Sequence, residues 1–375
     1  MKRMTVLLLI LCLLLCACRK SPEATEPSTE PSVETTDGVP TDDPTLNTTE
    51  SDTKPSEEPS TDPSAQYRHP LTGEGLAEPW EGQVAAIVIN NISDALPHHG
   101  VSQADMIFEI ETEGGITRML DIYTHFEDVG SIGPVRSARS FFNNVAVSFD
   151  APLIHCGGSK YALNGNYDDS GNVIPNWEHV DGRFYDGSFF FRDKDRYENQ
   201  GYAWEHTLFT NGANVIKMLE YTKLYKPGSQ EYGLTFAADP QVEGQKAQQV
   251  KVSFRGGKTS EFAYNEETGL YEMSQYGSRY IDAGNGQQMA FRNVIVVYSD
   301  QWFVYDGTYN RSFYDLLGSG EGLAAVGGKI QRITWNRQKL EDPFTYTLED
   351  GSALTLGVGT TYVAVTSPKS TATFQ

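Results

Sequence analysis

The stretch QVAAIVIN at residues 83–90 is apolar at every position between its two terminal amide side chains. A continuous apolar run of this length is typical of a strand that is buried on both faces of a sheet. Two further strands are predicted at residues 105–111 (DMIFEIE) and 118–124 (RMLDIYT), and Glu113-Gly114-Gly115 between them has the composition of a hairpin turn. The sequence therefore predicts a sheet with residues 83–90 as a central strand.

The segment after this hairpin supplies helices and one more buried strand. Its apolar residues recur at helical spacing behind a Gly133-Pro134 turn. The predicted elements are a helix at 137–148, a strand at 151–156, a short helix opened by residues 157–159 and a helix from about 211 to 225. Together with the hairpin they form a mixed α/β unit.

From about residue 245 the pattern changes to short β-rich runs separated by Gly and Asn turns, which is typical of a mainly-β module. The length that remains after residue 66 favours two domains. We therefore predict an α+β protein. A mixed α/β N-terminal domain at residues 67–240 is followed by a mainly-β C-terminal domain at residues 245–366, and the two adjoin.

The first residues have the pattern of a bacterial lipoprotein signal peptide at residues 1–18. Lys2 and Arg3 precede an apolar run at 6–15, which is too short to cross a membrane because a spanning helix needs about 20 residues. Leu-Cys-Ala-Cys at 15–18 matches a lipobox, with a small residue before Cys18. We expect lipidation of Cys18 and an acyl anchor on the extracytoplasmic face of the cell membrane. An ordinary secretory signal with cleavage after Ala17 is the alternative.

Residues 19–66 are predicted to be a disordered acidic tether. They hold twelve acidic and three basic residues, many Pro, Ser and Thr, and no aromatic residue. Such a stretch buries too little apolar surface to offset its ordering entropy. The whole chain has a formal net charge of -21, and an acidic excess of this size argues against a nucleic acid as partner.

Six motifs follow one another between residues 89 and 159: Ile89-Asn90, Ala95-Leu-Pro97, Gly100-Val-Ser-Gln-Ala-Asp105, Glu113-Gly-Gly-Ile-Thr-Arg118, Ile132-Gly-Pro-Val-Arg-Ser-Ala-Arg139 and His155-Cys-Gly-Gly-Ser159. This series resembles the YerB-like lipoproteins, a family built of a domain of unknown function and a second, C-terminal domain. The resemblance covers nearly all of residues 67–366. It implies a bacterial lipoprotein with an extracytoplasmic two-domain body, and it supplies no catalytic residues.

Three arginines, Arg118, Arg136 and Arg139, stand near the predicted start of the helix at 137–148. The positive end of a helix dipole is an unfavourable place for cations, so a negative group is expected beside them. Two partners remain open: an anionic ligand held in bidentate fashion, or the acidic side chains of the hairpin, namely Asp105, Glu109, Glu111 and Glu113.

Gly157-Gly158-Ser159 follows a buried strand and opens a helix, so its backbone N–H groups are candidates for binding the same anion. Turn and N-cap chemistry is the alternative interpretation. We predict that this tripeptide and the three arginines converge on one ligand-binding cleft, with His155, Glu113 and Asp105 as further members. Cys156 points to the opposite strand face from His155, so the two cannot form a dyad.

No catalytic residue, metal site or cofactor is predicted. His98-His99 lies near Asp94 and Asp105 in the sequence, but HExxH and CxxC motifs are missing. The sequence also lacks a GxSxG nucleophile elbow and a P-loop.

The expected function is therefore non-catalytic binding. A membrane-anchored lipoprotein would bind an anionic or polar cell-envelope component, such as a cell-wall component, or a partner protein. One alternative is an enzyme that acts on envelope glycans or peptides with an unfamiliar site around His155, Glu113 and the arginines. A second alternative is a structural adaptor that works through the C-terminal β domain.

Overall fold

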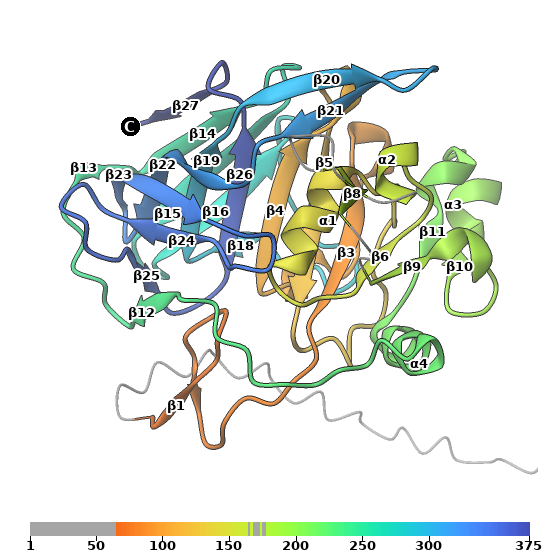
Figure 1. Cartoon of the computed structure of the whole chain (residues 1–375), viewed down its shortest axis with the longest axis horizontal. Coiled ribbons are helices and arrows are strands. Elements are labelled where there is room, and N and C mark those ends of the chain that lie inside the picture. Colours follow the sequence, from red (N-terminus) through yellow and green to blue (C-terminus); the bar gives the residue numbers. More distant parts are fainter. Residues whose placement is uncertain (1–64, 164–165, 168–172, 175–177) are drawn as a thin grey trace, which may run out of the picture. The chain divides into compact units, whose positions relative to one another are not determined.

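The computed structural model describes residues 65–163, 166–167, 173–174 and 178–375, which belong to one compact unit (Figure 1). The predicted signal peptide, the predicted lipidation site Cys18 and the predicted tether up to residue 64 lie outside the described residues. Within the described part of the chain, no helix is long and apolar enough to cross a membrane.

A mixed sheet of eleven strands forms the centre of the unit (Figure 1). Ten strands follow one another across it, and an eleventh, β24 (Thr345–Thr347), pairs with β23. The order is β13 (Gln245–Lys246), β23 (Lys329–Arg337), β22 (Gly318–Val326), β19 (Asn293–Tyr298), β26 (Thr361–Thr366), β4 (Met106–Glu111), β5 (Thr117–Tyr123), β3 (Ala85–Asn91), β6 (Leu153–His155) and β9 (His179–Asp181).

The predicted central strand is β3. Ala86 and Val88 pack into the core on one face of the sheet, and Ala85 and Ile87 pack into the core on the other face. All four side chains are fully buried. β5 lies antiparallel to β3 on one side and β6 lies parallel to it on the other. The prediction is confirmed, because a strand that is covered on both faces has no position for a polar side chain along its middle.

This one sheet runs through both predicted domains. β3, β4, β5, β6 and β9 come from the first predicted domain, and the other six strands come from the second. β26 lies parallel to β4, with Val363 opposite Phe108. Backbone hydrogen bonds thus join the two halves across the middle of the sheet. The described chain is mostly β-strand, with four α-helices.

A second, antiparallel sheet packs on one face of the main sheet. Phe262 in this sheet contacts Tyr362 of β26, with ring centroids 4.7 Å apart, and apolar side chains of both sheets form one continuous core. Its order is β17 (Ser278–Arg279), β16 (Leu270–Gln275), β15 (Thr259–Asn265), β14 (Gln249–Ser253) and β27 (Thr371–Phe374), with β18 (Ala290–Phe291) also paired to β16.

The other face of the main sheet is covered in part by α1 (Ser140–Val147), whose Phe142 packs into the core there. The helix predicted at 137–148 is confirmed, but it starts later. Ala138 is still extended, because it forms a β-bridge with Gly158.

The helix predicted at 211–225 is α4 (Gly212–Thr222). The side chain of Asn211 accepts a hydrogen bond from the N–H of Asn214 at 2.8 Å and caps its first turn. Lys223, with a φ of 60°, ends the helix in the left-handed conformation.

The remaining elements are short. The other two helices are α2 (Lys160–Leu163) and α3 (Lys194–Glu198). Five strand pairs complete the described strands: β1 (Tyr67–Arg68) with β2 (Gly75–Leu76), β7 (Asn166–Tyr167) with β8 (Val173–Ile174), β10 (Phe191–Arg192) with β11 (Leu208–Phe209), β12 (Thr235–Ala237) with β25 (Thr355–Gly357), and β20 (Gln301–Tyr305) with β21 (Asn310–Tyr314).

Candidate functional site

The three arginines that were predicted to converge lie together at the start of α1. Arg118 stands in β5 opposite Asn90 of β3. Its Nη1 donates a hydrogen bond to the backbone carbonyl of Ser137 at 2.7 Å. The pairing of β5 with β3 thus places the Arg118 guanidinium beside the turn that contains Arg136 and Arg139. The charges of Arg136 and Arg139 lie close enough to repel that of Arg118.

Arg139 pairs with a carboxylate of the hairpin. Its Nε lies 2.8 Å from both carboxylate oxygens of Glu113, and its Nη1 donates to the carbonyl of Ala138. Arg139 is the N-cap residue of α1 and is buried. Burial alone would raise the pKa of Glu113, but the hydrogen bond and the charge of Arg139 outweigh it and lower that pKa below its usual range. For Arg139, the internal partner is therefore the correct alternative.

Arg136 pairs with a carboxylate from outside the hairpin. Its Nη2 lies 2.7 Å from Glu205 Oε1, and the two side chains are 22% and 53% exposed. The Nε of Arg136 is buried and has no hydrogen-bond partner among the described residues. Because an exposed ion pair contributes only about 0–1 kcal/mol, an incoming anion can displace Glu205 from Arg136 with little loss of free energy.

Arg118 is the least neutralised of the three. The residue is 5% exposed, it forms no ion pair with any described residue, and its Nε is buried without a hydrogen-bond partner there. Burial lowers the pKa of Arg118 well below its usual range, and the positive charges of Arg139 and Arg136 lower it further, whereas the carboxylate of Glu113, which pairs with Arg139, raises it. A buried guanidinium among like charges is unfavourable, so the described acidic side chains leave this cation without an adequate counterion.

A fourth arginine approaches the cluster from far along the chain. Arg311 of β21 lies close enough to Arg118 to lower its pKa. It is itself neutralised, because its Nε lies 2.6 Å from Asp306 Oδ2. The sequence analysis missed Arg311, Asp306 and Glu205, since no local pattern marks partners that only the fold brings together.

The tripeptide at 157–159 lies beside the arginines, as predicted. Backbone hydrogen bonds join it to Ala138. However, the N–H of Gly157 donates to Asp181 at 2.9 Å, and the N–H of Ser159 donates to the carbonyl of Ala138. These two donors are already used within the protein, so turn and N-cap chemistry explains the tripeptide better than anion binding.

His155 supports this turn from within. Its Nδ1 lies 2.7 Å from the carbonyl oxygen of Gly157, and its Nε2 lies 2.9 Å from Nδ1 of His179. Burial lowers the pKa of His155 to about 4, so the ring is neutral at neutral pH. The neighbouring Cys156 is half-buried, and burial raises the pKa of its thiol. A thiol with a raised pKa is a poor nucleophile.

Asp105 lies apart from the arginines, and the prediction that it shares their site is wrong. It immediately precedes β4, where its Oδ2 accepts hydrogen bonds from the N–H and the hydroxyl of Thr124, both at 2.7 Å. Six residues of strand, about 20 Å, separate it from the end of the hairpin where Glu113 lies. Glu109 is also excluded, because its side chain points toward the second sheet.

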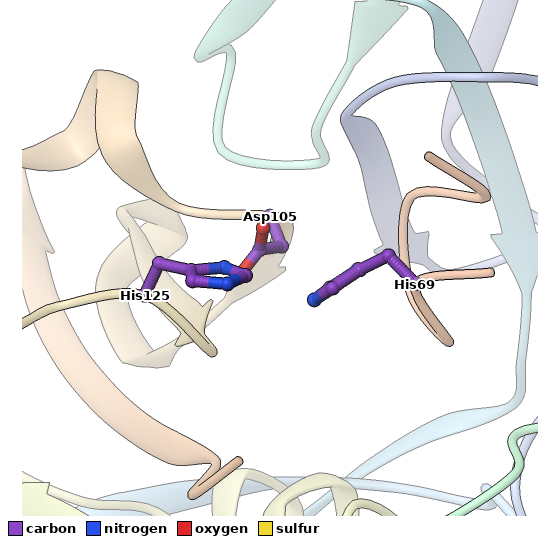
Figure 2. A group of neighbouring side chains, drawn as sticks. All are labelled: His69, Asp105 and His125. Atoms are coloured by element: carbon purple, nitrogen blue, oxygen red, sulfur yellow. The ribbon is translucent and has the colours of Figure 1, made fainter. Parts of the chain in front are cut away.

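A second group of titratable side chains surrounds Asp105. His69, Asp105 and His125 place candidate metal-ligand atoms within 4.8 Å of one another (Figure 2). All three converge on the Thr124 hydroxyl, at 2.9 Å from His69 Nε2, 2.7 Å from Asp105 Oδ2 and 3.1 Å from His125 Nδ1. The N–H of Thr72 donates to His69 Nδ1. The proton of that neutral ring is therefore on Nε2, the nitrogen that faces the group.

This arrangement explains the group without a metal ion. A hydroxyl group stands where the three side chains meet, and the imidazole nitrogen that a metal would need is protonated. Burial lowers the pKa of His69 to about 3, so the ring stays neutral. The group is best described as a hydrogen-bonded hub that ties the segment around His69 to the end of β5.

The histidine pair at 98–99 does not belong to this group. His98 is fully buried, and its Nδ1 lies 2.5 Å from the Tyr280 hydroxyl. Burial lowers the pKa of His98 to about 3. His98 therefore acts as a neutral hydrogen-bonding partner of Tyr280, which follows β17 of the second sheet.

Comparison with known proteins supports the expected family. Residues 71–225 match the family described as "Protein of unknown function (DUF3048) N-terminal domain", and residues 223–363 match the corresponding C-terminal domain. The chain is 27% identical over 277 residues to the Bacillus subtilis (strain 168) protein named "Putative lipoprotein YerB", which covers 72% of this chain and 77% of that protein. The crystal structure of YerB from Bacillus subtilis matches with a TM-score of 0.67 and 26% identity, over 82% of this chain and 99% of that chain. The chain therefore belongs to the DUF3048 family of proteins of unknown function.

Proposed function

We propose that this protein is a lipid-anchored extracytoplasmic binding module, which holds an anionic group of a cell-envelope component at Arg118 and Arg136. The observation that carries the proposal is the buried guanidinium of Arg118, which forms no ion pair with any described residue. A carboxylate or phosphate group would supply the missing charge and accept paired hydrogen bonds from a guanidinium.

The arginines differ in their pairing and exposure, and this difference supports the proposed function. Arg139 and Glu113 form a closed pair that fixes the hairpin to the start of α1. Arg136 is partly exposed and is paired with an exposed carboxylate, so it offers the route by which an anion reaches Arg118. Binding then replaces repulsion between Arg118 and Arg136 by attraction to a shared anion.

Arg118→Gln is expected to abolish anion binding and to leave stability unchanged or raised by about 1 kcal/mol, because it removes a buried cation that forms no ion pair with any described residue. The measurement is a thermal melt with and without inorganic phosphate, polyglycerol phosphate or a muropeptide, at matched ionic strength. The wild type should melt higher with at least one of these anions, and the variant should not respond. Arg279→Gln, at a side chain that is 68% exposed, is the control.

Two results would contradict the proposal. If no anion shifts the wild-type melt and Arg118→Gln is strongly destabilised, the arginine has only a structural role. Mass spectra of the anions after incubation should show no covalent change. A changed mass would favour an envelope-acting enzyme over a binding module.

The anchor is proposed from Cys18, which follows Ala17 in the lipobox-like sequence, and from the similarity to a protein named as a lipoprotein. Acyl chains on Cys18 would hold the body at the membrane surface, with the acidic segment at 19–66 as a spacer.

Cys18→Ala is therefore expected to abolish incorporation of labelled palmitate and to leave either released protein or uncleaved precursor. Cys16→Ala, a change two residues earlier in the same segment, should retain the label. Membrane fractionation and autoradiography measure both results. Labelled, detergent-extracted protein of mature size from Cys18→Ala would contradict the anchor.

A further inference from the structure

The second sheet leaves part of the main sheet uncovered. Its last strand is β27, which pairs with β14 and with no other described strand (Figure 1). Beyond this edge, β22 and β23 keep one face open: Glu321, Arg332 and Thr334 are exposed there. The alternate residues Ile333 and Trp335 are buried against the opposite face. The position for one more strand of the second sheet, above β22 and β23, is therefore vacant among the described residues.

A long groove occupies this position. Two depressions of about 980 Å³ and 600 Å³ share Tyr298, Glu321 and Ala372 in their walls, so they are continuous. β27 forms one wall of the groove through Ala372, and β22 lies beneath the groove, which it lines through Glu321. A groove of this length beside a strand edge has the shape that an extended polypeptide requires.

The backbone of β27 presents hydrogen-bonding groups toward this groove. Gln249 and Gln375 exchange both of their backbone hydrogen bonds. Such hydrogen-bonded pairs alternate with non-hydrogen-bonded pairs along an antiparallel ladder. The N–H and carbonyl of Thr373 therefore face β14, whereas those of Ala372 and Phe374 point away from it. The N–H and carbonyl of Phe374 and the carbonyl of Ala372 therefore remain available to an added strand.

The groove is strongly acidic. Of its charged side chains, Arg332 is basic, and six are acidic: Glu243, Asp300, Asp315, Glu321, Glu349 and Asp350. No ion pair to any described residue involves Asp300, Asp315 or Glu321. In the same wall, the hydroxyl of Ser370 is buried and has no hydrogen-bond partner within the described chain. The acidic segment at 19–66 would be repelled here, so charge favours a cationic occupant.

We propose that this groove docks an extended, lysine- or arginine-bearing segment of another protein, which adds as a strand to the free edge of β27. The added backbone pairs with Phe374 and Ala372. Alternate basic side chains of the segment reach the unpaired carboxylates of Asp300, Asp315 and Glu321. This surface is separate from the arginine cluster, which attracts the opposite charge.

The test uses the full-length protein and a fluorescein-labelled peptide of roughly eight residues that alternates lysine with valine or threonine. Fluorescence anisotropy should show saturable binding to the wild type. Asp300→Lys combined with Glu321→Lys is expected to weaken it about tenfold or more, because two attractive charges become repulsive. Glu127→Lys combined with Asp128→Lys changes the net charge equally at another exposed place and should leave affinity unchanged.

Strand addition has its own controls. A peptide with proline at its central position should bind much more weakly, since proline cannot donate to a ladder. Phe374→Pro should bind more weakly than Phe374→Ala, because both lose the ring but only proline removes the outward N–H. Equal binding of the proline peptide, no binding of the alternating peptide, or an unchanged affinity after the Asp300 and Glu321 reversals would overturn the proposal. So would a wild-type dimer in sedimentation that Phe374→Pro dissociates, because a second copy would then occupy the edge.

Discussion

Lys258→Met is expected to lower the free energy of unfolding by about 3–5 kcal/mol, because it leaves the buried carboxylate of Glu109 without its cation. Lys258 lies in the turn between β14 and β15, and its Nζ pairs with Glu109 of β4 in the space between the two sheets. The side chains are 4% and 0% exposed. Water therefore cannot replace the missing charge.

The surrounding hydrogen bonds keep Glu109 ionised. Burial alone would raise the pKa of Glu109, but Lys258 and neighbouring hydroxyl donors lower it below its usual range. The Tyr362 hydroxyl donates to Glu109 Oε2 at 2.6 Å, and the Thr117 hydroxyl donates to Oε1 at 2.5 Å. Without Lys258, burial would raise the pKa of Glu109, so the variant must either bury an unpaired carboxylate or take up a proton, and both lower the free energy of unfolding.

Chemical denaturation at neutral pH measures the effect of Lys258→Met. Lys251→Met is the matched control, because Lys251 pairs with Glu261 at the surface, where the side chains are 48% and 44% exposed. This control should change stability by about 0.5 kcal/mol or less. Adding Glu109→Gln to Lys258→Met should recover part of the loss, since it removes the uncompensated charge. Equal losses from the two lysine variants would contradict the assigned role of the pair.

Arg139→Ala is expected to lower the free energy of unfolding by about 2–3 kcal/mol, somewhat less than breaking a fully buried pair. The variant leaves Glu113, whose side chain is 17% exposed, without the Nε donor that contacts both of its oxygens. It also removes the bond to the carbonyl of Ala138. The hairpin would then be held less firmly to the start of α1.

The comparison of Arg139→Ala with Arg118→Gln separates the structural arginine from the proposed ligand-binding arginine. Thermal and denaturant unfolding should show a clear loss for Arg139→Ala and none for Arg118→Gln. Glu113→Gln should cost less than Arg139→Ala, because the amide oxygen can still accept from Arg139. An unchanged free energy of unfolding for Arg139→Ala would show that the pair contributes nothing to stability.

The buried strands were predictable because their signal is local. Residues 83–90 are apolar at successive positions, and β3 is indeed covered on both faces. The helix starts were less predictable. Ala138 has the spacing of a helical residue, yet a backbone bridge to Gly158 holds it extended, and a contact between separate segments has no local signal.

The candidate site was predictable only in part. The nearness of Arg118, Arg136 and Arg139 could be inferred, because a hairpin and the following helix are adjacent in sequence. Glu113, the partner of Arg139, was one of four acidic candidates that the sequence could not rank, and Glu205, the partner of Arg136, could not be inferred. Asp105 and Glu113 are both acidic residues of the same hairpin, but six strand residues place them at opposite ends of it.

By itself, the sequence determined the apolar runs that become buried strands, the acidic excess, the lipobox-like start and the motifs of the DUF3048 family, because each is a property of neighbouring residues. Tertiary structure alone decided that β26 pairs with β4 and that Lys258 meets Glu109. It also decided that β27 is an edge strand of the second sheet in the described part of the chain. These pairings join residues from distant parts of the chain, and which of many possible partners meet is settled only when the whole core packs.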